Sequence, residues 1–115
     1  MKLVVFILNR EELLEQVLEA FVEAGVPGAT VLDSSGMGRM LSSEVPLFAD
    51  LQDSMKGIRP ANRVIFSLVG GEPTVQRLER LLEKACGNLS VPGNGLLFTV
   101  PVDYAKGLRP EEAEA

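Results

Sequence analysis

Two glycine-rich segments hold the residues whose types and spacing could bind a ligand. The first contains Gly28, Gly36 and Gly38, which flank a short apolar stretch, and it ends at Arg39. Glycine lets the backbone approach a ligand and present free N–H groups to phosphate oxygens, and an arginine adds a charged hydrogen bond. The pattern indicates an anion-binding loop at 36–39, although glycines beside a strand also form ordinary turns.

The second segment lies immediately before the last apolar run of the chain. It contains Gly93, Asn94 and Gly95, which can take backbone conformations that other residues avoid. A loop of this kind could face a phosphate group, but Asn-Gly is also the strongest signal for an ordinary hairpin turn. By itself, this segment leaves both interpretations open.

The residue types that are missing or rare exclude several kinds of catalytic and metal site. The chain has no histidine and one cysteine, Cys86. This excludes a Cys/His zinc site, a Ser-His-Asp centre and a Cys-His centre, and we expect no metal. We interpret Cys86 as a small buried core residue, because no second thiol exists to pair with it.

Charge and hydropathy set the broad class of the protein. The 11 basic residues are outnumbered by 16 acidic ones, so we expect no binding to nucleic acid, which requires a basic face. The longest apolar run, Leu3 to Leu8, is far shorter than the ~20 residues of a membrane-spanning helix. We therefore expect a cytoplasmic protein that is not embedded in a membrane.

The apolar spacing predicts four strands and two helices. The first helix follows Asn9, a candidate N-terminal cap, and Gly25 is expected to end it. The predicted strands cover 2–8, 29–33, 63–69 and 96–102, and the predicted helices cover 10–24 and 73–86.

The resulting order, β-α-β-β-α-β, is typical of a ferredoxin-like α+β sandwich with four antiparallel strands and two helices on one face. We expect one domain over 1–103 and a tail over 104–115. A long loop over about 37–60 joins the second and third strands, and 47–55 could form a short helix within it. Because the strands are apolar at nearly every position, the uncovered sheet face predicts association with further copies of the chain.

The two glycine segments, in this order around these elements, resemble the PII signalling family. The helix-to-strand junction GVPGATV starts the resemblance, and Gly36-Met37-Gly38-Arg39 matches the base of the family's long T-loop. Gly93-Asn94-Gly95-Leu96, followed by LFTVPV, matches its B-loop and last strand. The resemblance spans residues 1–103, so we interpret the chain as a divergent PII-like protein.

This resemblance implies a non-enzymatic regulatory protein that forms a homotrimer, with three sheets around a central barrel and an adenine nucleotide in each cleft between neighbouring subunits. Thr30 corresponds to a threonine near the adenine. Gly36, Gly38 and Arg39 correspond to the base of the T-loop, and Gly93, Asn94 and Gly95 correspond to the phosphate-facing B-loop.

Several departures from the family pattern affect the expected ligand. Leu96 replaces the lysine that ends the B-loop. The family's paired arginines after the last strand are not present as a pair, and only Lys106 and Arg109 lie nearby in the sequence. With fewer positive contacts, AMP, cyclic AMP or cyclic di-AMP suits the site better than ADP or ATP. Met40 replaces the glutamine tied to 2-oxoglutarate and magnesium, so nitrogen sensing through 2-oxoglutarate is not expected.

The apolar residues in 40–60 suggest that this loop docks on an unknown regulated protein, although it could also fold back on its own trimer. Two other functions remain open. One is a trimeric scaffold that has lost nucleotide binding. The other is an acylphosphatase-like enzyme, for which Asn9 and Arg10 follow the first strand without a glycine-rich cradle.

Overall fold

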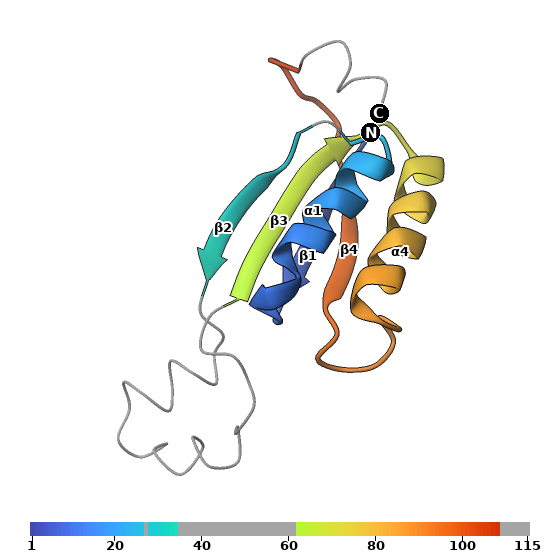
Figure 1. The fold of residues 1–115 in the computed structure, drawn as a ribbon. Helices are drawn as coiled ribbons and strands as arrows, with labels where there is room; N and C mark the ends of the chain where they lie inside the picture. Colours follow the sequence, from blue (N-terminus) through green and yellow to red (C-terminus); the bar gives the residue numbers. More distant parts are fainter. Residues whose placement is uncertain (27, 35–61, 109–115) are drawn as a thin grey trace.

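The computed structural model describes residues 1–26, 28–34 and 62–108 and contains the predicted elements in the predicted order (Figure 1). The bounds are β1 Lys2–Leu8, a 3-10 turn η1 Glu11–Leu13, α1 Leu14–Glu23, β2 Thr30–Ser34, β3 Asn62–Val69, α4 Glu72–Cys86 and β4 Leu96–Pro101.

The four strands form one antiparallel sheet in the order β2-β3-β1-β4. Figure 1 shows α1 and α4 together on one face of this sheet. The long apolar runs therefore occupy the two central strands, while β2 and β4 form the edges. This arrangement confirms the expected ferredoxin-like α+β fold.

The core lies between the sheet and the two helices. Alternate residues of β1, namely Val4, Phe6 and Leu8, have no exposed surface and pack in one cluster with Leu78 and Leu82 of α4. Successive strand residues point to opposite faces of a sheet, so each second residue of an apolar run enters this core. The remaining apolar strand residues must then lie on the other face.

The beginning of the first helix differs from the prediction. Asn9 does not cap it, because the chain first forms the 3-10 turn η1 and Arg10 occupies the position before that turn, with no side-chain capping hydrogen bond. The Leu13 N–H donates to the Arg10 carbonyl oxygen at 3.0 Å. An ion pair between Arg63 Nε and Glu11 Oε1, 3.2 Å apart, ties this turn to β3.

The end of the same helix follows the prediction. Gly25 has a φ of 89°, and its N–H donates to the Val22 carbonyl oxygen at 3.0 Å. The Val26 N–H donates to the Phe21 carbonyl oxygen, which completes a Schellman motif. Buried Val26 then directs the chain towards β2.

Cys86 is buried at the end of α4, as expected for a small core residue. Burial raises the pKa of the Cys86 thiol, because the charged thiolate would lose its hydration, and nearby Arg10 lowers it by a smaller amount. The thiol therefore stays neutral at physiological pH and serves packing.

The sheet face opposite the helices is apolar over all four strands. The strand register aligns Val5 with Phe66 on one side and with Phe98 on the other, so that side chains from neighbouring strands lie together. We call this surface the open face; its members are Leu3, Val5, Ile7, Thr30, Leu32, Val64, Phe66, Leu68, Leu96, Phe98 and Val100. Thr30 is the polar member of this set, and the polar pair Ser34–Asn62 follows at one end of the same face. None of the described helices is long and apolar enough to cross a membrane.

The two ends of the connection between β2 and β3 lie side by side in the sheet. Ser34 pairs with Asn62 in the register, and the Ser34 hydroxyl donates to the Asn62 carbonyl oxygen at 3.4 Å. The predicted loop 37–60, the possible helix 47–55 and the tail from 109 lie outside the described residues.

Candidate functional site

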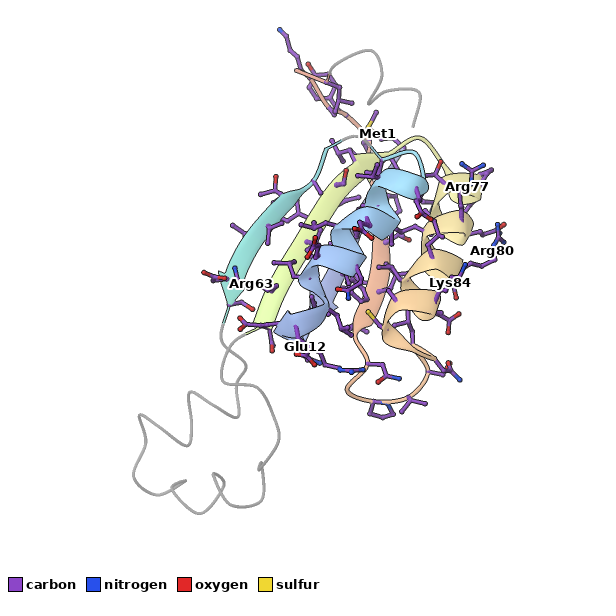
Figure 2. The ribbon with its side chains drawn as sticks, in the orientation of Figure 1. Met1, Glu12, Arg63, Arg77, Arg80 and Lys84 are labelled. Carbon is purple, nitrogen blue, oxygen red and sulfur yellow. The ribbon has the colours of Figure 1, made fainter. Side chains whose placement is uncertain are left out.

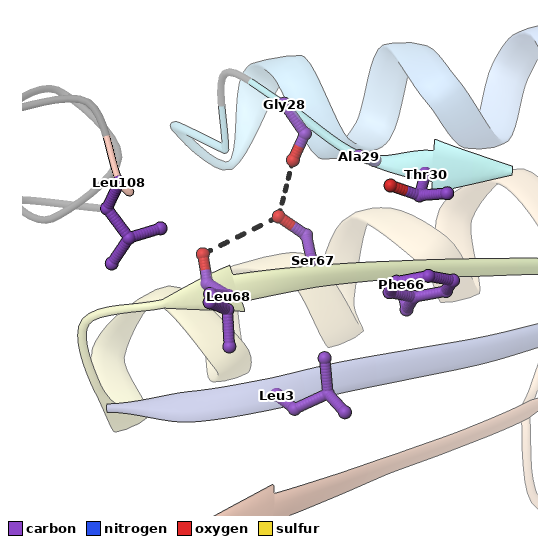
Figure 3. Close-up of a pocket in the computed structure, with 8 residues that line it drawn as sticks. All are labelled: Leu3, Gly28, Ala29, Thr30, Phe66, Ser67, Leu68 and Leu108. Atoms are coloured by element: carbon purple, nitrogen blue, oxygen red, sulfur yellow. Dashed lines mark hydrogen bonds between the residues drawn. The ribbon is translucent and has the colours of Figure 1, made fainter. Parts of the chain in front are cut away.

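A pocket of about 460 Å³ lies where β2 begins, on the side of the open face (Figure 3). Thr30, the residue predicted to lie near a nucleobase, is part of its wall. Sequence reasoning had also singled out Gly28, in the first glycine-rich segment, and it missed the other members. These come from β1, the stretch before β2, β3 and the chain after β4: Leu3, Ala29, Phe66, Ser67, Leu68 and Leu108.

Ser67 fixes one wall of this pocket. It is the one polar residue among the buried residues that the structure describes, and it lies between buried Ile65 and Val69 in β3. Its hydroxyl donates to the Gly28 carbonyl oxygen, as Figure 3 shows, and thereby ties the chain before β2 to β3. A buried hydroxyl must be hydrogen-bonded, so this bond both satisfies Ser67 and positions Gly28.

The lining sets the chemistry of the pocket. It contains the apolar side chains of Leu3, Phe66, Leu68 and Leu108, the Thr30 hydroxyl and backbone polar groups, and none of its lining residues is charged. Such a wall suits a flat, uncharged ring with hydrogen-bonding edges, because Phe66 offers an aromatic surface and Thr30 a donor and acceptor. It does not suit a phosphate group.

The second predicted segment forms the connection between α4 and β4, and its own side chains hold it together. The Asn94 Nδ2 donates to the Asn88 carbonyl oxygen at 2.9 Å. The Ser90 N–H donates to the Asn88 Oδ1, also at 2.9 Å. Leu89 N–H donates to the Glu83 carboxylate at 3.0 Å. Asn94 therefore shapes the loop, a role that its position in the sequence did not reveal.

The two glycines of this loop differ in their surroundings. Gly95 has a φ of +132°, and a Cβ atom there would lie 2.6 Å from Cζ of Phe6, which has no exposed surface. Gly93 has a φ of +94° and open space where a Cβ would lie. Packing against Phe6 thus explains why residue 95 is a glycine. Gly93, in contrast, presents its backbone to solvent and suits contact with a ligand.

The predicted site residues lie on opposite edges of the sheet. Thr30 belongs to the edge strand β2, and the loop containing Gly93 leads into the other edge strand, β4. Neighbouring strands are about 4.8 Å apart, so about 14 Å separates the two edges. One copy of the chain therefore does not bring Thr30 and the 93–95 loop together.

The end of β2 lies at the same end of the sheet as the 93–95 loop (Figure 1). Gly36, Gly38 and Arg39 follow it in sequence and lie outside the described residues. At the end of β2, Arg63 Nη1 lies 2.5 Å from Asp33 Oδ1, and Arg63 Nε lies near Glu11. This three-residue ion-pair group holds the start of the long connection, and it follows from the strand register rather than from any sequence motif.

The loop region carries no charge of its own. Residues 87–101 contain no Asp, Glu, Lys or Arg, and Leu96, at the position where a lysine was expected from the resemblance, is exposed on the open face. Anion binding at this loop would depend on backbone N–H groups. The Gly93 N–H makes no hydrogen bond within the described part of the chain.

A family model for the nitrogen regulatory protein P-II matches residues 1–112. The chain belongs to the P-II family. The match covers both glycine segments and every described helix and strand, and it confirms the resemblance drawn from the sequence. No curated protein matches the sequence.

Membership of the P-II family, whose proteins are regulatory, argues against the acylphosphatase-like alternative. The local structure gives the same indication. Arg10 Nε lies 3.3 Å from Glu12 Oε1, so the arginine that such chemistry would need is paired with a carboxylate beside it. Asn9 and Arg10 are therefore best explained as residues of the turn after β1.

Replacing Gly95 by alanine tests the packing role assigned to this residue. The new Cβ would clash with Phe6 and would also be strained at positive φ, so we expect a loss of about 3 kcal/mol of unfolding free energy. Gly93→Ala carries the conformational strain alone and should cost about 1 kcal/mol. Urea denaturation of both variants measures the difference, and equal losses would contradict the assigned contact.

Proposed function

We propose that this P-II protein is a homotrimeric sensor that binds an adenine-type nucleotide between neighbouring copies and signals through residues 37–60 to a partner protein in the cytoplasm. The observation that carries the proposal is the P-II match over residues 1–112, together with an uncharged pocket at Thr30. The fold, with its apolar open face, is compatible with this assembly.

The pocket supports the base-binding part of the proposal. Its apolar walls and the aromatic ring of Phe66 would remove one face of a purine from water, and Thr30 would hydrogen-bond an edge of the ring. Ser67 would act as a positioning residue, because its bond to the Gly28 carbonyl oxygen holds the wall that contacts the base.

The phosphate end of the ligand would be bound by backbone groups of a second copy. The Gly93 N–H of that copy is free within the described residues, and Gly36, Gly38 and Arg39 would complete the contacts. Because residues 87–101 are uncharged, few cations offset the three or four negative charges of a triphosphate. We therefore expect AMP, cyclic AMP or cyclic di-AMP to bind more tightly than ADP or ATP.

The open face supports the oligomeric part of the proposal. Leu96, Phe98 and Val100 of the edge strand β4 are 55%, 41% and 41% exposed in a single copy. Soluble monomers seldom expose a contiguous apolar surface of this extent. Closing three sheets around one axis would bury this surface and bring the β2 edge of one copy near the β4 edge of the next.

Signalling would use the connection that leaves the sheet at Ser34 and returns at Asn62. A ligand held against Gly36, Gly38 and Arg39 would favour one arrangement of the loop base, beside the Asp33–Arg63 ion pair. The shift can be no larger than the difference in ligand affinity between the loop arrangements. A partner that binds one arrangement would then sense the ligand.

One observation favours a second candidate, a trimeric scaffold without a nucleotide. The loop that would face the phosphates carries no cation, and Leu96 offers an apolar side chain in place of a positive one. Under this alternative, the pocket at Thr30 would serve assembly only, and residues 40–60 would bind a partner constitutively.

Calorimetric titration with ATP, ADP, AMP, cyclic AMP and cyclic di-AMP distinguishes the two candidates. We expect micromolar or tighter binding of AMP or a cyclic nucleotide, with weaker binding of ATP. Thr30→Trp should abolish the binding by filling the pocket, whereas Thr30→Ser keeps the hydroxyl and should preserve it. A protein that binds none of the five nucleotides would contradict the sensor function and favour the scaffold.

A subunit-mixing experiment tests whether two copies form each site. Thr30→Trp blocks the pocket, and Gly93→Asp places a negative charge on the loop. The positive φ of Gly93 strains any side chain, but aspartate adopts such a conformation more readily than most residues. Each variant alone should fail to bind the nucleotide identified by titration. Refolding the two variants together at equal amounts should restore binding at about a quarter of the sites of a ring, since each site then draws its two halves from independent copies.

A site contained in one chain gives the opposite result in this experiment. Every chain in the mixture carries one defect, so no wild-type site could form and binding would stay absent. Sedimentation of the mixture, compared with each variant alone, checks that mixed oligomers have formed.

A further inference from the structure

The outer surface of α1 is acidic with an apolar centre. Glu15, Glu19 and Glu23 recur at four-residue spacing and are exposed on the helix. Val22 lies among them, is 70% exposed, and lines a shallow hollow of about 500 Å³ together with Leu18. We call the three glutamates the acidic stripe; among the described residues, none of them forms an ion pair.

The outer surface of α4 carries the opposite charge. Arg77, Arg80 and Lys84 follow a three- and four-residue spacing that places them on one side of the helix, and they extend into solvent (Figure 2). We call them the basic stripe; within the described part of the chain these three also have no carboxylate partner. Arginine and lysine stems additionally offer apolar surface that can cover a residue such as Val22.

The two stripes lie in the same layer and have nearly equal lengths. At 1.5 Å per residue, the acidic stripe spans about 12 Å and the basic stripe about 10 Å. α1 and α4 pack side by side and run in opposite directions (Figure 1). A two-fold axis parallel to the helices, between two facing helix layers, therefore places α1 of each copy against α4 of the other.

We propose that the helix layer is a self-complementary docking surface for a second copy of this chain, with the acidic stripe of each copy against the basic stripe of the other. Two-fold symmetry repeats this charge match in the second half of the contact, so the complementarity of one chain suffices for the whole interface. This contact uses the face opposite to the open face, so it is separate from the assembly proposed above and would join one oligomer to the next.

The association is expected to be weak and to depend strongly on salt. Exposed ion pairs contribute little individually, and the net charge of −5 per chain opposes contact between copies. The ion pairs between the acidic and basic stripes act at short range, so moderate salt screens them less than it screens distant charges. High salt still removes most of their attraction. The contact would therefore form at high local concentration.

Sedimentation velocity of the full chain at about 25 mM and about 500 mM salt tests the proposal. The wild type should sediment at low salt as species larger than the one present at high salt, in a concentration-dependent manner. Glu19→Lys and Arg80→Glu should each raise the apparent dissociation constant about tenfold or more, because one reversal turns two symmetry-related attractions into repulsions. An equimolar mixture of the two variants should recover association, because each stripe then meets its complement again.

Two control variants distinguish the loss of contacts between the stripes from the effect of a changed net charge. Asp103→Lys and Lys106→Glu make the same charge changes at exposed positions after β4, outside both stripes, and should leave the association unchanged. A wild type with one sedimentation coefficient at both salt concentrations would overturn the proposal, as would control variants that act like the stripe variants. The species present at high salt reports the open-face assembly in the same experiment, so failure of one proposal is distinguishable from failure of the other.

Discussion

The rest of the structure depends on a sheet that is apolar on both faces. A strand sends successive side chains to opposite sides. The largely apolar runs of β1 and β3 therefore supply a core on one side and a second apolar surface on the other. The described residues form two α-helices, and both lie on one face. The opposite face keeps Phe98 and Val100 at 41% exposure each, and covering this surface is the main favourable term left for association.

The location of the candidate site follows from the same sheet. Because β2 and β4 are its two edges, Thr30 and the loop at Gly93 lie on opposite sides of one copy. An assembly that buries the open face brings different edges together and could complete a site that neither copy has alone. Binding and assembly would then be coupled, since a ligand between two copies stabilises the contact that forms its site. The long connection starts at the same edge, at Ser34.

The sequence predicted the strands, the helices and their order well, because these depend on local apolar spacing and on glycine at helix ends, as at Gly25. It failed where a contact joins distant parts of the chain. Asn9 looks like a helix cap, but the chain forms a 3-10 turn tied to β3 through Arg63 and Glu11. Gly95 stays a predicted ligand-binding residue, but the sequence could not show that the ring of Phe6 beside it also requires a glycine there.

The pocket shows the same limit. Of its lining residues, Thr30 and Gly28 were singled out from the sequence, whereas the others come together through the strand register and the chain after β4.

We infer that the open face is an interface between copies, and sedimentation equilibrium of the wild-type protein at high salt tests this inference. We expect a species of three times the chain mass of 12.4 kDa across a wide range of concentrations. A stable monomer under these conditions would contradict it.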